Sequence, residues 1–161
     1  PQSYDTGLDV DPFDAVCDHL LVEEIKTGAT VGTYRTQPGP RAATHLGYYS
    51  EQEFDFAPFE SQRSQLIELG RACVHKGHRN LAVLHLLWKG IARYAVAHQS
   101  RFLIGCSSLT SQDPGGALGA YLELATFLAD PERRTLPNAA DQRPADRPPD
   151  RTAKIPKLPH P

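Results

Sequence analysis

The sequence has no long apolar run, no methionine and only three cysteines, and each scarcity excludes a class of protein. No segment approaches the roughly 18 consecutive apolar residues of a membrane-spanning helix, and no signal-peptide-like stretch opens the chain. The cysteines are odd in number, far apart and without CxxC spacing, which disfavours a disulfide framework and favours reduced, buried thiols. We therefore expect an intracellular, cytoplasmic protein.

Basic residues are also scarce in the first part of the chain. Residues 1–130 carry 10 Lys and Arg against 15 Asp and Glu, whereas residues 131–161 carry 7 against 4. Binding to nucleic acid needs a clustered basic face that neutralises phosphates, so this acidic region excludes a nucleic-acid partner.

The composition changes near residue 130. Eight of the last 31 residues are proline and no apolar period remains, so residues 131–161 are predicted to be an extended or disordered tail. Residues 1–130 are predicted to be one domain. Because the chain begins at Pro1 and contains no methionine, we expect a partial domain from a longer protein.

The hydrophobic pattern predicts a mixed α/β order of elements. Two strand-like runs separated by a glycine-containing turn predict a hairpin, and a later strand, helix and strand predict a parallel pair. In chain order we expect an acidic loop or short helix over 1–18, strands over 19–25 and 30–37, a long packed loop over 38–65, a strand over 66–74, a helix capped by Asn80, a strand over 101–109 and a helix beginning at Asp113 and Pro114.

Two opposite charges interrupt the apolar run 66–74. Glu68 and Arg71 would point to opposite faces of a regular strand, but a bulge at Gly70 would bring both side chains to one face. Burying such a pair costs desolvation, which a functional site would justify. A salt bridge at the end of an edge strand explains the spacing equally well.

A basic turn follows, with His75, Lys76, His78 and Arg79 before the helix that Asn80 caps. A helix N-terminus presents free N–H groups and positive dipole to an anion, so a phosphate would suit this place. A solvated basic loop is the alternative that spacing leaves open.

Other groups of reactive residues give weaker patterns. A zinc site is disfavoured because its ligands would straddle a strand end, a turn and a helix without paired-cysteine or HExxH spacing, so no metal is expected. GCSSL at 105–109 lacks the nucleophile-elbow motif. The residues considered for zinc are Cys73, His75, His78 and His85. Ser107 and Ser108 are expected to be strand-end hydroxyls, and Cys17 and Cys106 core thiols. Trp88 lies with Leu84, Leu87, Ile91 and Ala95 on the apolar helix face, where it is expected to be core or the wall of a channel.

Several motifs together resemble a known superfamily. The strand, basic turn and helix resemble the pantetheine-binding region of the GNAT acyltransferases. D-x-x-D from Asp11 to Asp14, G-x-x-R ending in Arg35, and E-x-x-R from Glu68 to Arg71 resemble the branch that takes acyl chains from acyl carrier protein. Over about residues 9–130 the chain is most similar to the ornithine lipid N-acyltransferases, often called hemolysin-like. The runs that carry this similarity are FDAVCDHLLVEE, VGTYR, YYSEQEFD, ELGRACVHKGHRN, LLWKGIARY and GCSSLTSQDP.

The resemblance implies a GNAT-like mixed central sheet flanked by helices, with the family's first strand and helices upstream of Pro1. It implies transfer of a 3-hydroxyacyl chain from the phosphopantetheine of acyl carrier protein to the α-amine of ornithine. No separate cofactor is then needed. Peripheral contact with the inner membrane surface is left open, and this piece of the chain alone is expected to be inactive.

The same resemblance implies roles for individual residues. Glu68 would take the amine's proton, directly or through one water, and Arg71 would order Glu68 or hold the substrate carboxylate. The remaining assignments are Asp11, Asp14 and Arg35 for substrate binding, and Cys73, Val74, His75, Arg79, Asn80 and Ala82 for the pantetheine arm and its phosphate, with a backbone N–H near Cys73 or Val74 for the oxyanion.

Two alternatives remain. One is another enzyme of the same kind, an acyl-homoserine-lactone synthase or another N-acyl amino acid synthase. The other is a catalytically inactive module that binds the carrier protein.

Overall fold

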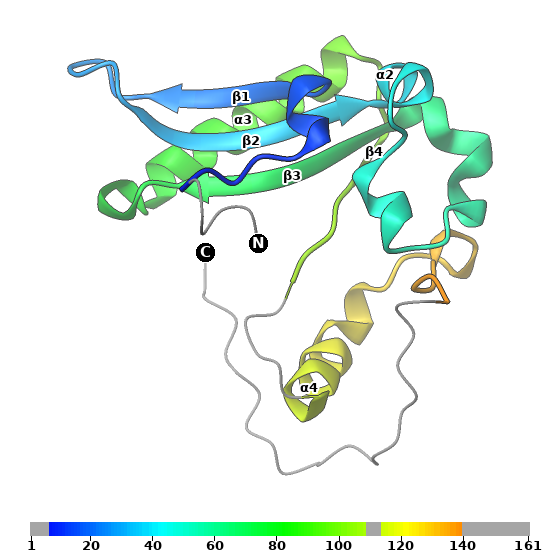
Figure 1. The fold of residues 1–161 in the computed structure, drawn as a ribbon. Helices are drawn as coiled ribbons and strands as arrows, with labels where there is room; N and C mark the ends of the chain where they lie inside the picture. The colour runs from blue at the N-terminus through cyan, green and yellow to red at the C-terminus, as the bar shows by residue number, and fades with distance from the viewer. Residues whose placement is uncertain (1–6, 109–113, 140–161) are drawn as a thin grey trace. The chain divides into compact units, whose positions relative to one another are not determined.

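The structure is a computed structural model that describes residues 7–108 and 114–139. The chain divides into two compact units, Pro1–Gln52 with Ser61–Cys106 and Glu53–Glu60 with Ser107–Pro161. The first unit carries a four-stranded sheet in the order β1-β2-β3-β4 (Figure 1). The strands are β1 Asp18–Glu23, β2 Thr30–Pro38, β3 Leu66–Val74 and β4 Phe102–Ile104.

Short helices connect the strands, and one long helix packs on the sheet. In the first unit these are η1 Pro12–Ala15, α2 Gly39–Thr44, η2 Tyr49–Gln52, η4 Lys76–His78 and α3 Leu81–Ala97, and η3 Ala57–Gln65 runs into it from the second unit. The second unit contains α4 Pro114–Leu124, η5 Ala125–Phe127 and η6 Pro131–Arg133. The region predicted as a long loop therefore contains three short helices.

The predicted hairpin is confirmed, because β1 and β2 pair antiparallel from Asp18↔Thr36 to Glu23↔Thr30. Gly28 in the turn has φ +71°, a left-handed conformation that glycine adopts without steric cost. Strand β2 also pairs antiparallel with β3. Strand β3 pairs parallel with β4, as the strand-helix-strand order predicted.

Helix α3 begins as predicted, with the Asn80 side chain accepting a hydrogen bond from the Val83 N–H at 3.1 Å. Its buried residues are Val83, Leu87 and Ile91. The prediction that Trp88 belongs to the core is wrong, because Trp88 is 46% exposed, although its ring lies 6.5 Å from the Tyr34 ring. Leu87 and Ile91 are buried as predicted, and Val83 is buried in place of Trp88.

The sheet has a face that α3 covers and a face that it does not. A Cβ placed on Gly32 would meet Val83 and Leu87 of α3, and Tyr34 packs against the core cluster that contains these two residues, so Gly32 and Tyr34 point toward the helix. Val31 also belongs to this core cluster, because the pairing of β2 with β1 is irregular between Gly32 and Thr30. Arg35 and Gln37 therefore point to the other face, since strand residues alternate. Figure 1 shows the N-terminal segment and η1 on that second face.

Strand β3 contains the predicted bulge, displaced by one position. Thr33 pairs with Cys73 and Arg35 with Gly70, so Tyr34 lies opposite both Arg71 and Ala72. Arg71 has φ +51°, whereas Gly70 pairs regularly. The extra residue moves Cys73 to the face of Arg35 and Val74 to the face of α3, where Val74 packs against the core.

The cysteines and the last elements differ in part from expectation. Cys17 is buried as predicted, whereas Cys73 is exposed and Cys106 is only partly buried. Strand β4 is shorter than the predicted 101–109, and α4 begins at Pro114 with its proposed cap outside the described residues. Tyr121 and Leu122 of α4 are more than half exposed.

Of the predicted tail, residues 131–161, the structure describes only residues 131–139. In the second unit Phe54 bridges Pro137, and residues 140–161 lie outside the described residues. The boundary at residue 130 stays a prediction. No helix in the described ranges is long and apolar enough to cross a membrane.

Candidate active site

A short acidic segment, residues 8–15, is here called the acidic strap. Its turn is built by the sequence Asp-Pro-Phe-Asp: Asp11 Oδ1 accepts hydrogen bonds from the N–H groups of Phe13 (2.8 Å) and Asp14 (3.2 Å), and Asp14 Oδ2 accepts one from the Asp11 N–H (2.9 Å). Pro12 takes the first helical position, where no N–H is needed. The turn holds both carboxylates in fixed positions.

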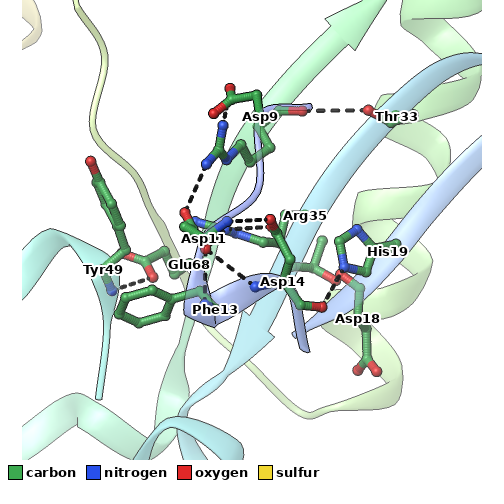
Figure 2. Close-up of polar contacts among 12 residues, drawn as sticks. Asp9, Asp11, Phe13, Asp14, Asp18, His19, Thr33, Arg35, Tyr49 and Glu68 are labelled. Atoms are coloured by element: carbon green, nitrogen blue, oxygen red, sulfur yellow. Dashed lines mark hydrogen bonds and ion pairs between the residues drawn. The ribbon is translucent and has the colours of Figure 1, made fainter. Parts of the chain in front are cut away.

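Arg35 of β2 binds both of these carboxylates from the sheet. Its Nη1 lies 2.6 Å from Asp11 Oδ1 and 2.7 Å from Asp14 Oδ1, with the Arg35 side chain only 7% exposed. The guanidinium also lies 5.5 Å from the centre of the Phe13 ring and 5.8 Å from that of Tyr49, as Figure 2 helps to show. A buried arginine with two carboxylates and two ring faces ties the acidic strap to the sheet.

Arg71 makes the second link between strap and sheet. Its Nη2 lies 2.9 Å from Asp11 Oδ2, and its Nη1 forms an ion pair with Asp9. The left-handed backbone at the bulge gives Arg71 this position. Three carboxylates face two guanidinium groups, so the cluster of Asp9, Asp11, Asp14, Arg35 and Arg71 keeps a net negative charge.

Arg35 and Arg71 lower the pKa values of carboxylates in the acidic strap. Burial by itself raises the pKa of Asp11, but hydrogen bonds and positive charge from Arg35 and Arg71 lower it on balance. Burial also raises the pKa of Asp14, but the hydrogen bond from the Asp11 N–H and the hydrogen bond and charge of Arg35 lower it on balance. Both carboxylates are therefore ionised at neutral pH.

Glu68 does not pair with Arg71, although the sequence places them three residues apart. Glu68 Oε2 accepts a hydrogen bond from the Tyr49 N–H at 2.7 Å (Figure 2). Glu68 Oε1 accepts from the Ser50 N–H at 2.7 Å and from the Ser50 hydroxyl at 2.5 Å. Glu68 is 6% exposed. The carboxylate thus holds the first turn of η2 against β3, and the predicted ordering of Glu68 by Arg71 is not what the contacts show.

The pairing between the parallel strands is short and ends at Glu68. Pairing between β3 and β4 covers three residues and, in the described part of the chain, ends at Glu68↔Ile104. Gly105 follows at close range, since a Cβ there would lie 2.4 Å from the Leu69 carbonyl oxygen. Cys106 then donates a hydrogen bond from Sγ to Ser50 Oγ at 3.4 Å. Glu68, Ser50 and Cys106 therefore meet where the pairing of β3 with β4 ends.

The residues predicted to bind the pantetheine arm lie together at the end of β3 and the start of α3. Arg79 Nε donates to the Val74 carbonyl oxygen at 3.4 Å, and His75 Nδ1 accepts from the Gly77 N–H at 3.2 Å. Asn80 caps α3, with Ala82 in its first turn. The turn thus places Arg79 and His75 next to the helix N-terminus, where an anion would be favoured. Their roles in binding stay predictions.

The structure adds residues that the sequence interpretation missed. Asp9 completes the ion pairs, Ser50 binds Glu68, and Cys106 binds Ser50. Gln37 is the cross-strand partner of Glu68, is 1% exposed, and has no hydrogen-bond partner for either amide atom among the described residues. Of these residues, only Asp9 could have been predicted from the sequence, because it lies two residues before the D-x-x-D motif.

No group of three or more His, Cys, Asp or Glu side chains within residues 7–108 and 114–139 could hold a metal ion. The set considered for zinc is not assembled: Cys73 is exposed, and the His75 and His78 rings contact each other, with their Nδ1 atoms 3.3 Å apart. His78 Nε2 lies 3.6 Å from Glu24 instead.

Comparison with known proteins gives a consistent result. Residues 1–89 match the family model described as an acetyltransferase (GNAT) domain. Three relatives bear the name L-ornithine N(alpha)-acyltransferase. The protein of Rhodobacter capsulatus is 34% identical over 115 residues, covering 68% of this chain and 44% of the relative. That of Agrobacterium fabrum is 39% identical over 113 residues (66% and 39%), and that of Brucella abortus 37% over 119 (69% and 42%). The chain thus spans about two fifths of the length of these relatives.

Proposed function

Because the chain belongs to the GNAT acetyltransferase domain family, we propose that it is part of an N-acyltransferase that moves a 3-hydroxyacyl chain from acyl carrier protein to the α-amine of ornithine. The observation that carries the proposal is the buried Glu68 at the end of the β3–β4 pairing, beside a cluster of net negative charge. The names of the aligned relatives support the acceptor.

The acidic strap suits an acceptor with a cationic side chain. Asp11 and Asp14 are engaged by Arg35, whereas the Asp9 side chain is 75% exposed and the cluster holds one more carboxylate than guanidinium groups. A positively charged ornithine side chain would be attracted there. Arg71, 30% exposed, would bind the substrate carboxylate, a group whose geometry arginine matches.

The donor is proposed to approach from the end of β3. Arg79, His75 and the N–H groups at the start of α3 would hold the phosphate of the pantetheine arm, which arrives on the carrier protein as part of the substrate. The thioester is proposed to lie along β3 beyond the last residue that pairs with β4, where a backbone N–H near Cys73 or Val74 would stabilise the oxyanion. Val74 is fixed in the core by α3, which keeps this segment of backbone in place.

Glu68 is proposed as the proton acceptor of the reaction. An amine that attacks a thioester must lose a proton, so a base is required. Glu68 is enclosed by η2, with both oxygens accepting hydrogen bonds, so an intervening group would carry the proton to it. We place this reaction in the cytoplasm, with peripheral contact at the inner membrane surface, because an acylated amino acid partitions into lipid.

The test uses the full-length protein with a 3-hydroxyacyl carrier protein and a panel of amines, and reads product mass. We expect N-acyl ornithine as the main product and none when the carrier protein is omitted. An acyl-homoserine lactone or another N-acyl amino acid would reassign the acceptor. Carrier-protein binding without amide formation from any amine would instead identify an inactive binding module.

A further inference from the structure

Gln37 carries a buried side-chain amide that nothing in the described part of the chain binds. The residue is 1% exposed, and neither its Nε2 nor its Oε1 has a hydrogen-bond partner among the described residues. Buried polar groups in proteins are nearly always hydrogen-bonded, because an unpaired one keeps the full cost of its desolvation. An amide in this state therefore calls for a functional explanation.

The strand register places this amide beside the proposed base. Gln37 pairs directly with Glu68 across β2 and β3, so both side chains lie on the face of the sheet that carries Arg35. Directly opposed residues have Cβ atoms about 4.5–5.5 Å apart. Both Glu68 oxygens accept hydrogen bonds from Tyr49 and Ser50, and none of these bonds involves Gln37. The amide is thus next to the base but takes no part in holding it.

The neighbouring positions on the two strands show from which side a substrate can reach Gln37. Gly70 follows the base on the same face, and a Cβ there would have only the Arg35 guanidinium within 4 Å among the described residues, at 3.8 Å. In the other direction a Cβ on Gly39 would collide with the Arg63 carbonyl oxygen. The approach to Gln37 is therefore from the side of Gly70, along β3.

This direction indicates which part of the substrate arrives at Gln37. The pantetheine arm is proposed to enter near Arg79 at the end of β3, with the thioester between that end and Glu68. The acyl chain continues on the far side of the thioester from the pantetheine, which is toward Gln37. In a 3-hydroxyacyl chain the hydroxyl is the polar group on that side, and the rest of the chain is apolar.

Resting on the acyl transfer proposed above, we propose that Gln37 binds the 3-hydroxyl of the acyl chain and makes the enzyme selective for 3-hydroxyacyl donors. A hydroxyl can accept a hydrogen bond from Nε2 or donate one to Oε1, so it fits this amide in either role. An unsubstituted chain offers neither bond and leaves the amide buried and unpaired. A mismatch of this kind discriminates strongly between substrates.

The test is a competition between two donors in one reaction. The full-length protein receives ornithine and equal amounts of two acyl carrier proteins, one with a 3-hydroxyacyl chain and one with an unsubstituted chain of the same length. The two products differ in mass by one oxygen atom, and their ratio at low conversion gives the ratio of kcat/KM for the two donors. This ratio does not depend on the fraction of enzyme that is folded. We expect the wild type to prefer the 3-hydroxyacyl donor by at least about 10-fold.

Matched variants assign the preference to the amide. Gln37→Leu and Gln37→Met replace it with apolar groups, so the preference should fall by about 10-fold or more, because the hydroxyl loses its partner while the unsubstituted chain gains an apolar neighbour. Gln52→Leu makes the same change at an exposed glutamine of η2 and should keep the wild-type ratio. The KM for ornithine should stay near the wild-type value in all three variants.

The outcomes separate this inference from the proposed function. If the wild type makes N-acyl ornithine but both Gln37 variants keep its donor preference, the inference is refuted and the transferase stands. If the variants instead raise the KM for ornithine at an unchanged ratio, the amide faces the acceptor and the inference is equally refuted. If the wild type makes no amide from either donor with any amine, the proposed function has failed and this inference with it.

Urea unfolding gives a measurement that is independent of activity. An amide that waits for a substrate can be replaced without lowering the free energy of unfolding, so Gln37→Leu should be at least as stable as the wild type while it loses its donor preference. A less stable Gln37→Leu with an unchanged preference would show that Gln37 has a structural role only.

Discussion

Replacing Glu68 with glutamine tests the structural role of the carboxylate independently of any activity. Glu68 accepts three hydrogen bonds, two at Oε1 from Ser50 and one at Oε2 from the Tyr49 N–H. In Glu68→Gln one of these oxygens becomes an NH₂ group. If the amide nitrogen takes the Oε2 position, it faces the Tyr49 N–H donor to donor.

The expected magnitude follows from these contacts. Loss of a hydrogen bond to a charged acceptor costs about 1.5–3 kcal/mol, and the two bonds at Ser50 fall to the strength of neutral ones, a further loss of about 0.5–1 kcal/mol each. Relief of the desolvation of a buried charge offsets part of this. We therefore expect Glu68→Gln to lower the free energy of unfolding by roughly 2–4 kcal/mol.

The assay is urea unfolding of the wild type, Glu68→Gln and Glu23→Gln. Glu23 is exposed on β1 of the same sheet, so Glu23→Gln makes the identical chemical change without the buried contacts and should stay within about 0.5 kcal/mol of the wild type. Hydrogen exchange of the Tyr49 and Ser50 amides should accelerate in Glu68→Gln only. A Glu68→Gln protein as stable as the wild type, with both amides still protected, would refute the reasoning.

Three further predictions concern the same unit. Gln37→Leu removes an unpaired buried amide and should raise the free energy of unfolding by about 1 kcal/mol, measured by urea unfolding; destabilisation would show that the amide has a partner. The pKa of Asp11 is lowered, so ionised Asp11 stabilises the fold at pH values above about 4, and this stabilisation is lost as the pH falls through the lowered pKa. In Asp11→Asn the free energy of unfolding should therefore fall less steeply at acid pH than in the wild type. An unchanged acid dependence would contradict this. Burial raises the pKa of Cys17 to about 11, so iodoacetamide at pH 8 should modify Cys73 well before Cys17, as peptide mapping can check; equal rates would contradict the burial of Cys17.

The strands and helix starts could be predicted because local chemistry determines them. The hairpin, β3 and the Asn80 cap follow from alternation, a turn glycine and a side-chain acceptor, which act over a few residues. The exposed position of Trp88 could not be predicted, because a helix of this composition offers several apolar stripes and the sheet selects one of them.

The sequence could predict which residues form the site, but not which of them contact each other. Motif spacing gathered Asp11, Arg35, Glu68 and Arg71, and the structure brings all four to one face of the sheet. The spacing could not show that Glu68 binds backbone N–H groups from residue 49 onward, because that contact depends on how an irregular segment returns to the sheet. Cys106 depends in turn on where β4 leaves β3.

The extra residue in β3 also bears on how this strand tolerates change. Before Arg71 the even-numbered residues of β3 lie on the face of Arg35, and after Ala72 the odd-numbered residue Cys73 does. Deleting Ala72 would leave Arg71 alone opposite Tyr34 in a regular ladder, with Cys73 still on the face of Arg35 and Val74 still on the face of α3. The Arg71 side chain would then turn to the face of Tyr34, away from Asp9 and Asp11 of the acidic strap. A one-residue deletion would therefore remove one guanidinium group from the cluster without changing any of its charged residues, which makes the length of β3 as much a determinant of the site as any residue in it.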